Sequence, residues 1–123
     1  GYVGFGVAHD FLQVLAERLE GPSRAVVDAA LESFAPDALA AEQLAAAAAA
    51  DEVLGSRLAL WGRRLVGEAL GFVNDLLSAR PALVRVLACE PVDPGEQSTS
   101  AAKLFSHLTA AHSRRMGRIG LTA

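Results

Sequence analysis

Apolar residues recur at helical spacing along most of the chain, and most strongly between Ser56 and Ala79. In this stretch one set of apolar residues follows spacings of three, four or seven, the period of one helix face: Leu58, Trp61, Leu65, Phe72 and Leu76. An adjoining stripe contains Val66, Leu70, Val73 and Leu77. A helix that is apolar over so much of its circumference needs neighbours on two sides. We therefore place this helix at the centre of the fold.

The same period predicts five further helices, separated by glycine, proline or polar residues. Their expected ranges are 7–20, 24–34 after a cap at Ser23, 37–54 with Gly55 as C-cap, 82–89, and about 98–116. We expect residues 1–6 to form a flexible arm, 90–99 a surface loop and 117–123 a tail. The sequence thus predicts an all-α bundle of five or six helices around a central long helix, in a single domain spanning 1–123.

Two glycines, Gly67 and Gly71, lie four residues apart inside the predicted central helix. Each glycine in a helix interior costs about 1 kcal/mol relative to alanine. One explanation is close approach of another backbone, from this chain or from a second copy. The other is a tolerated feature of the sequence without a packing role. On the first explanation Gly67 and Gly71 are dimer-interface candidates, and we expect a homodimer.

Composition excludes several classes of protein. The 123 residues contain one cysteine, Cys89, so there is no internal disulfide framework and we expect a reducing, cytoplasmic location. Charged residues interrupt every long apolar run, so we expect no membrane span. No basic segment leading into an apolar core marks a signal peptide at the start. The preference for alanine, and for arginine over lysine, is typical of a GC-rich bacterial genome.

Charge is distributed unevenly along the chain, whose net charge is −3. The segment from residue 101 onward contains no acid and four cations: Lys103, Arg114, Arg115 and Arg118. Cations at a helix C-terminus complement the helix dipole. Alternatively, Arg114, Arg115 and Arg118 contact an anion or an acidic partner. The acidic remainder of the chain argues against nucleic acid as that partner.

No residue pattern predicts catalysis, and we expect no catalytic residue, metal ion or cofactor. His107 and His112 lie five apart on the last predicted helix, where they point in directions about 140° apart and cannot easily share a metal. His9 and Asp10 are adjacent and also diverge. Cys89 has no histidine close to it in sequence that would activate its thiol. The chain is therefore expected to be a binding protein more readily than an enzyme.

A binding pocket is predicted if the central and last helices face each other. Its lining would then be apolar and aromatic, from Trp61, Phe72, Phe105, His112 and Met116. Pockets between the helices of a bundle are common sites for small ligands. The alternative is that these five residues form the ordinary core.

Two stretches resemble parts of the tetracycline-repressor family of transcription regulators. Ser23–Ala35 resembles the first helix of that family's DNA-binding domain. Leu70–Pro91, especially Ala79–Glu90, resembles paired helices of its ligand-binding domain. The third predicted helix departs from the pattern, because the alanines at 45–50 are followed by Asp51 and Glu52 where a recognition helix needs hydrogen-bond donors. The resemblance implies an all-helical, dimeric, ligand-sensing module and carries over no DNA-contacting residue.

These observations favour a non-enzymatic regulatory or ligand-sensing domain that dimerises through an apolar helix face and binds a small apolar ligand or a protein partner. Two alternatives remain open at this point. One is a protein-interaction adaptor that uses a basic C-terminal helix. The other is a small helical cofactor-binding protein that uses the His107, His112 and Arg114–Arg115 region.

Overall fold

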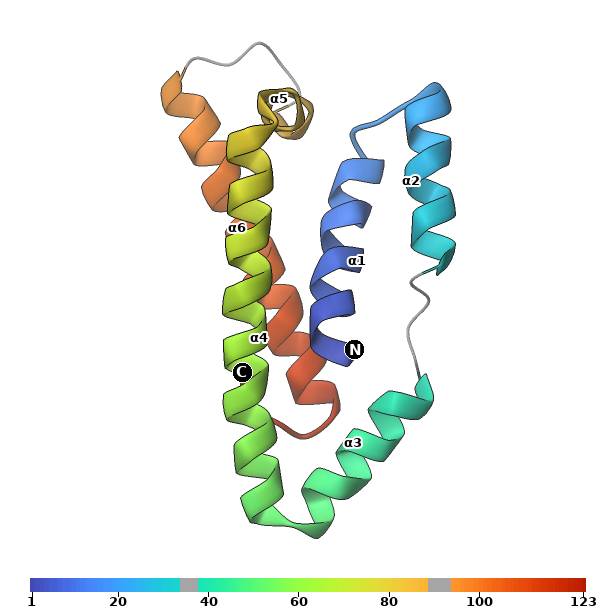
Figure 1. The fold of residues 1–123 in the computed structure, drawn as a ribbon, viewed down its shortest axis with the longest axis vertical. Helices are drawn as coiled ribbons and strands as arrows, with labels where there is room; N and C mark the ends of the chain where they lie inside the picture. Colours follow the sequence, from blue (N-terminus) through green and yellow to red (C-terminus); the bar gives the residue numbers. More distant parts are fainter. Residues whose placement is uncertain (34–37, 89–93) are drawn as a thin grey trace.

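The computed structural model describes residues 1–33, 38–88 and 94–123, and this part of the chain forms six helices and no strand. In chain order they are α1 (Tyr2–Ala16), α2 (Gly21–Ser33), α3 (Ala38–Ala50), α4 (Glu52–Ala79), α5 (Pro81–Ala88) and α6 (Pro94–Arg118) (Figure 1). The predicted all-α bundle is therefore confirmed. The predicted central stretch is the longest helix, α4, with 28 residues.

Helices α1, α4 and α6 supply the buried core. Their apolar side chains form one cluster, made of Val7, Phe11, Leu15, Val73, Leu77, Leu104 and Leu108. Side chains of α5, among them Leu83 and Leu87, cover one end of this cluster. A second cluster contains Val3, Met116 and Ile119, and α3 packs against it through Leu44. The core thus joins the first helix to the last.

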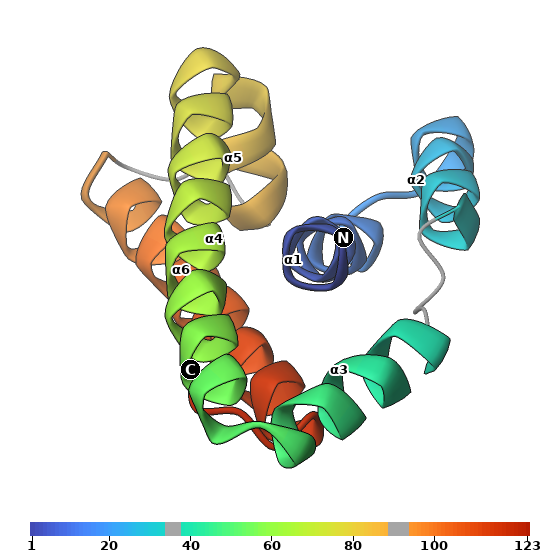
Figure 2. The same ribbon diagram turned by 60° about the horizontal axis from the view of Figure 1, so that its bottom comes forward.

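Helices α2 and α3 lie at the periphery, and no residue of either is buried. In Figure 2, α1 is seen nearly end-on, between α2 on one side and the α4–α6 pair on the other. α2 is held to α1 by Arg24, whose Nη1 donates to the Ala16 carbonyl at 2.6 Å. α3 packs against the beginning of α4. This arrangement leaves one side of α1 open toward α3.

The chain start differs from the prediction, because α1 begins at Tyr2 and includes the residues predicted as a flexible arm. Val3 is buried and Tyr2 packs against the second cluster. Burial of these side chains outweighs the helix cost of the glycines around them. At its other end α1 stops at Ala16, before the predicted end at Glu20.

The boundary between α3 and α4 also differs. Asp51 has an extended backbone, and its Oδ1 accepts from the Leu54 amide at 3.0 Å, so it is the N-cap of α4. Gly55, predicted as a C-cap, lies inside α4 and is buried. A Cβ on Gly55 would sit 3.2 Å from the Ala48 carbonyl oxygen, so the glycine lets α3 approach closely.

The last third of the chain is more helical than predicted. α5 begins at Pro81, and its predicted end at Cys89 lies outside the described residues. α6 starts at Pro94, so part of the predicted surface loop is helix. It continues to Arg118, two residues into the predicted tail. After the end of α6, Ile119 is buried and Gly120 has a positive φ of 73°, which directs the backbone away from the helix.

The outer face of α4 is solvent-exposed. Leu60 and Trp61 are each 61% exposed and Phe72 is 70% exposed. The buried residues of α4 include Val73 and Leu77, from the second predicted stripe. Charged residues interrupt the outer face, and no helix in the described part of the chain has the length and apolar character needed to cross a membrane.

Candidate functional site

Arg115 joins the last helix to the first. Its Nη2 donates to the Gly6 carbonyl at 3.0 Å and to Asp10 Oδ2 at 2.6 Å. The Tyr2 hydroxyl donates back to the Arg115 carbonyl at 3.3 Å. The Arg115 and Asp10 side chains are only 8% and 12% exposed, so this is a buried, charge-assisted pair. Removing either partner would leave the other as a buried, uncompensated charge.

Gly6 makes room for this bridge. A Cβ at Gly6 would overlap Nε and Cζ of Arg115 and lie 2.8 Å from its Cδ. The guanidinium therefore rests directly on the backbone of α1. This contact explains why a glycine occupies the interior of a helix at this position.

His112 lies beside the bridge on α6 and is 2% exposed. Within the described residues, neither of its ring nitrogens has a hydrogen-bond partner, and the same holds for Arg115 Nη1. Burial lowers the pKa of His112 below its ordinary value, and the charge of Arg115 lowers it further, while Asp10 acts in the opposite direction. His112 is therefore a neutral imidazole at pH 7. Its ring lies near Gly62, where a Cβ would be 4.0 Å from His112 Cε1.

A cleft of about 630 Å³ opens between α1, the facing ends of α2 and α3, and the end of α6. We call it the α1–α3 cleft. Its apolar wall consists of the Tyr2 and Phe5 rings and three alanines, Ala38, Ala40 and Ala41. Its polar lining includes His9, Asp10, Gln13, Arg115 and Arg118. The cleft thus places two guanidinium groups beside two aromatic rings.

The five predicted pocket residues do not line this cleft. Trp61 and Phe72 are on the exposed outer face of α4, whereas His112 and Met116 are buried. Phe105 is partly buried against the main core. Gly67 and Gly71 do not mark a close approach of another helix in the described part of the chain, because a Cβ at either position would have nothing within 4 Å there. Their predicted role between two copies remains a prediction.

The fold separates one of the three predicted anion contacts from the other two. Arg115 and Arg118 both line the α1–α3 cleft, where Arg115 is also paired with Asp10. Arg114 is exposed and does not line the cleft. With Arg115 used internally, the end of α6 offers fewer cations to an acidic partner than the sequence suggests.

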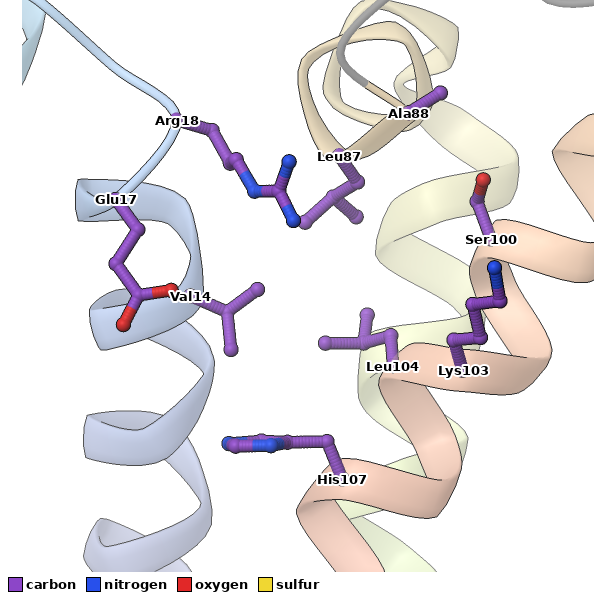
Figure 3. A pocket seen from close by; sticks show the side chains of 9 residues that line it. All are labelled: Val14, Glu17, Arg18, Leu87, Ala88, Ser100, Lys103, Leu104 and His107. Atoms are coloured by element: carbon purple, nitrogen blue, oxygen red, sulfur yellow. The ribbon is translucent and has the colours of Figure 1, made fainter.

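A smaller cleft of about 390 Å³ lies between the end of α1, α5 and α6 (Figure 3). Val14, Leu104 and the His107 ring project into it from α1 and α6. Glu17, Arg18 and Lys103 give its rim charges of both signs. His107 is exposed here while His112 is buried, so the two histidines do not meet.

This chain is a helical bundle with the polar side chains of Asp10 and Arg115 between two of its core helices. Bundles of this class often hold ligands or cofactors between their helices. A family model described as a ferritin-like domain of actinomycetes matches residues 1–90. This match spans nearly three quarters of the chain, which therefore belongs to that family. Neither the curated proteins nor the solved structures gave a match.

The family match overturns the resemblance to tetracycline-repressor regulators. That expectation was wrong, because the matching family is a ferritin-like one. The stretch that resembled the first DNA-binding helix forms most of α2, which has no buried residue and so is not the packed first helix of a compact domain. Amphipathic helices rich in alanine satisfy the patterns of many helical families, and this explains the error.

Ferritin-like metal proteins hold two metal ions between their helices with inward glutamates and Glu-x-x-His pairs. The side chains that the structure describes do not fit such a centre. No group of three or more His, Cys, Asp or Glu side chains lies together in the described residues. The inward carboxylate that is present, Asp10, is bound to Arg115, which replaces a metal as its positive partner.

Sequence reasoning singled out Arg115 and His112 but missed the residues that organise the site. Asp10 was considered only as a neighbour of His9, and Gly6 was placed in a flexible arm. Tyr2 was placed in the same arm. One signal was available in the sequence. Apolar residues at helical spacing extend back to Val3, which places Gly6 and Asp10 four residues apart on one helix.

Proposed function

We propose that this chain is a non-enzymatic, ligand-binding member of its ferritin-like family and that the α1–α3 cleft takes a small amphiphilic carboxylate. The observation that carries the proposal is the presence of Arg115 and Arg118 beside the Tyr2 and Phe5 rings in one cleft. The cationic groups suit a carboxylate head, and the rings and alanines suit its hydrocarbon part.

The charges support an anionic ligand. Asp10 neutralises Arg115, but Arg115 Nη1 keeps its donors without a partner among the described residues. Arg118 is exposed and adds a second guanidinium. A guanidinium matches the two oxygens of a carboxylate with parallel hydrogen bonds. The volume of about 630 Å³ lies within the usual range of small-molecule sites.

A sensing or carrier role agrees better with these groups than catalysis does. Asp10 is held by Arg115, whose Nη2 donates to Oδ2 at 2.6 Å, so this oxygen is already engaged within the chain. His112 is enclosed, and it has no nucleophile to activate among its described neighbours. Regulatory use of the bound ligand and a cytoplasmic location are parts of this proposal, the latter supported by the single cysteine.

Isothermal titration with decanoate tests the proposal, with decanol as an uncharged ligand of equal chain length. We expect saturable binding of decanoate and weaker binding of decanol. Arg118→Gln should raise the dissociation constant for decanoate about tenfold, since a hydrogen bond to a charged group is worth about 1.5 kcal/mol.

Arg114→Gln is the matched control, because Arg114 is exposed on the same helix and does not line the cleft. It should leave decanoate affinity unchanged. Absence of saturable decanoate binding, or equal effects of the two substitutions, would contradict the proposal.

A further inference from the structure

The outer face of α4 combines exposed apolar side chains with a regular charge pattern. Leu60, Trp61 and Phe72 are among the most exposed large apolar residues of the described chain. Arg57, Arg64, Glu68 and Asp75 run between them along the same face. Within the described residues, neither Arg57 nor Asp75 takes part in an ion pair, whereas Arg64 and Glu68 pair with each other at 2.8 Å.

The charges are arranged symmetrically about Val66. Arg57 and Asp75 lie nine residues before and after it, and Arg64 and Glu68 lie two residues before and after it. Eighteen residues make five whole helical turns, so Arg57 and Asp75 point in the same direction, about 27 Å apart along the helix. Basic residues thus occupy the first half of the face, and acidic residues occupy matching positions in the second half.

We propose that α4 pairs with α4 of a second copy of this chain, antiparallel, about a two-fold axis at the level of Val66. In such a pair residues equally far from the axis, on opposite sides of it, lie at the same height. Arg57 then faces Asp75 of the second copy, and Arg64 faces its Glu68. Each contact occurs twice. A parallel pair would instead bring like charges together, so the pattern selects the antiparallel arrangement.

The apolar residues of the face fit the same arrangement. Trp61 and Phe72 are eleven residues apart, which is three turns and about 20°, so they lie on one flank of the face. In the pair, Trp61 of one copy and Phe72 of the other differ in height by about 1.5 Å and make an aromatic contact. On the other flank Leu60 lies over Gly71 of the second copy.

Gly71 therefore has a packing role in this interface. A Cβ on Gly71 meets nothing within 4 Å in one copy, so the room that the glycine leaves is on the outside of the chain. Gly67 lies at the edge of the face. The contacts between Arg57 of one copy and Asp75 of the other lie at both ends of the interface. Both contacts form only if the two α4 helices cross at a small angle, near the value of about 20° that is typical of bundle helices.

This interface is separate from the α1–α3 cleft, which is formed by α1, α2, α3 and α6. The proposal therefore stands or falls independently of ligand binding there. It also accounts for exposed rings on a helix whose other side is buried in the core.

Sedimentation equilibrium of the purified chain at micromolar concentrations tests the proposal through charge reversal. The unmodified chain should sediment as a dimer. Arg57→Glu should raise the dimer dissociation constant at least about tenfold, because it replaces two attractive contacts with two repulsive ones. Asp75→Arg should do the same. The double variant carrying both changes should restore the dimer, because opposite charges face each other again.

Rescue by the double variant identifies the antiparallel pair, since positions 57 and 75 of one chain are too far apart to interact with each other. Arg114→Glu is the matched control: it makes the same charge change on α6 and should leave the mass unchanged. Circular dichroism verifies that each variant keeps its helix content. Three outcomes would each overturn the proposal. The unmodified chain could remain a monomer even at a concentration of about 100 µM, the dimer could be insensitive to Arg57→Glu, or the double variant could stay dissociated.

Discussion

The bridge between Asp10 and Arg115 should contribute heavily to stability. Asp10→Ala removes the acceptor that lies 2.6 Å from Arg115 Nη2 and leaves a guanidinium that is 8% exposed. Breaking a buried pair in this way costs about 3–5 kcal/mol. Native domains are stable by only about 5–15 kcal/mol in total, so this single change consumes a large share of the margin.

The double variant separates the pair from the burial of its members. Arg115→Met alone leaves the Asp10 carboxylate buried without its cation and should also be strongly destabilising. The variant with both changes buries no charge, and an apolar replacement of a buried pair is often neutral. Its loss should therefore be smaller than the sum of the single losses by at least about 2 kcal/mol.

Urea unfolding followed by circular dichroism gives these free energies. With a slope of about 1.5 kcal/mol per molar, Asp10→Ala should lower the midpoint by roughly 2–3 M. Asp28→Ala is the control, since it breaks the exposed Arg24–Asp28 pair and should cost no more than about 0.5 kcal/mol. Two results would show that the bridge does not stabilise the fold. One is a loss of unfolding free energy for Asp10→Ala no larger than that for the control. The other is additivity of the losses caused by Asp10→Ala and Arg115→Met.

Two further predictions concern glycine and histidine. Gly67→Ala meets no neighbour among the described residues and should raise the melting temperature through about 1 kcal/mol of helix propensity, whereas Gly62→Ala places a Cβ 2.6 Å from Met116 Cε and 3.2 Å from its Sδ in the core, so crowding should offset that gain and the melting temperature should rise less. Equal shifts would refute the packing described here. Because the pKa of His112 is lowered on folding, the unfolded chain takes up the proton more readily, so stability is full above about pH 6.5 and falls below it. The free energy of unfolding of His112→Leu should vary less between pH 7 and pH 5, and an unchanged slope would remove His112 as the cause.

Helical periodicity predicted most of the fold because the bundle follows it closely. Leu104 and Leu108 of α6 are buried as their spacing predicts, and so is Phe11 of α1. In α4 two apolar stripes satisfied the same period. The pattern does not determine which stripe faces the core, and the one that contains Trp61 and Phe72 includes the exposed outer residues.

The site was less predictable because its contacts join distant parts of the chain. Asp10 and Arg115 are 105 residues apart, and no local pattern connects them. Gly6 was taken as a sign of flexibility, since glycine near a chain end is most often unstructured. Only the position of Arg115 on α6 reveals that this glycine accommodates a side chain from the last helix.

The pairing of the first and last helices has a consequence for how the protein is made. Phe11 and Val7 leave the ribosome before their partners Leu104 and Leu108, which are synthesised more than 90 residues later. At about 5–20 residues per second, α1 must wait roughly 5–20 s before α6 can complete the cover of its core face, which α4 begins. During that interval an apolar helix stays open to chaperones and to neighbouring chains, so the success of synthesis depends on how that helix is protected.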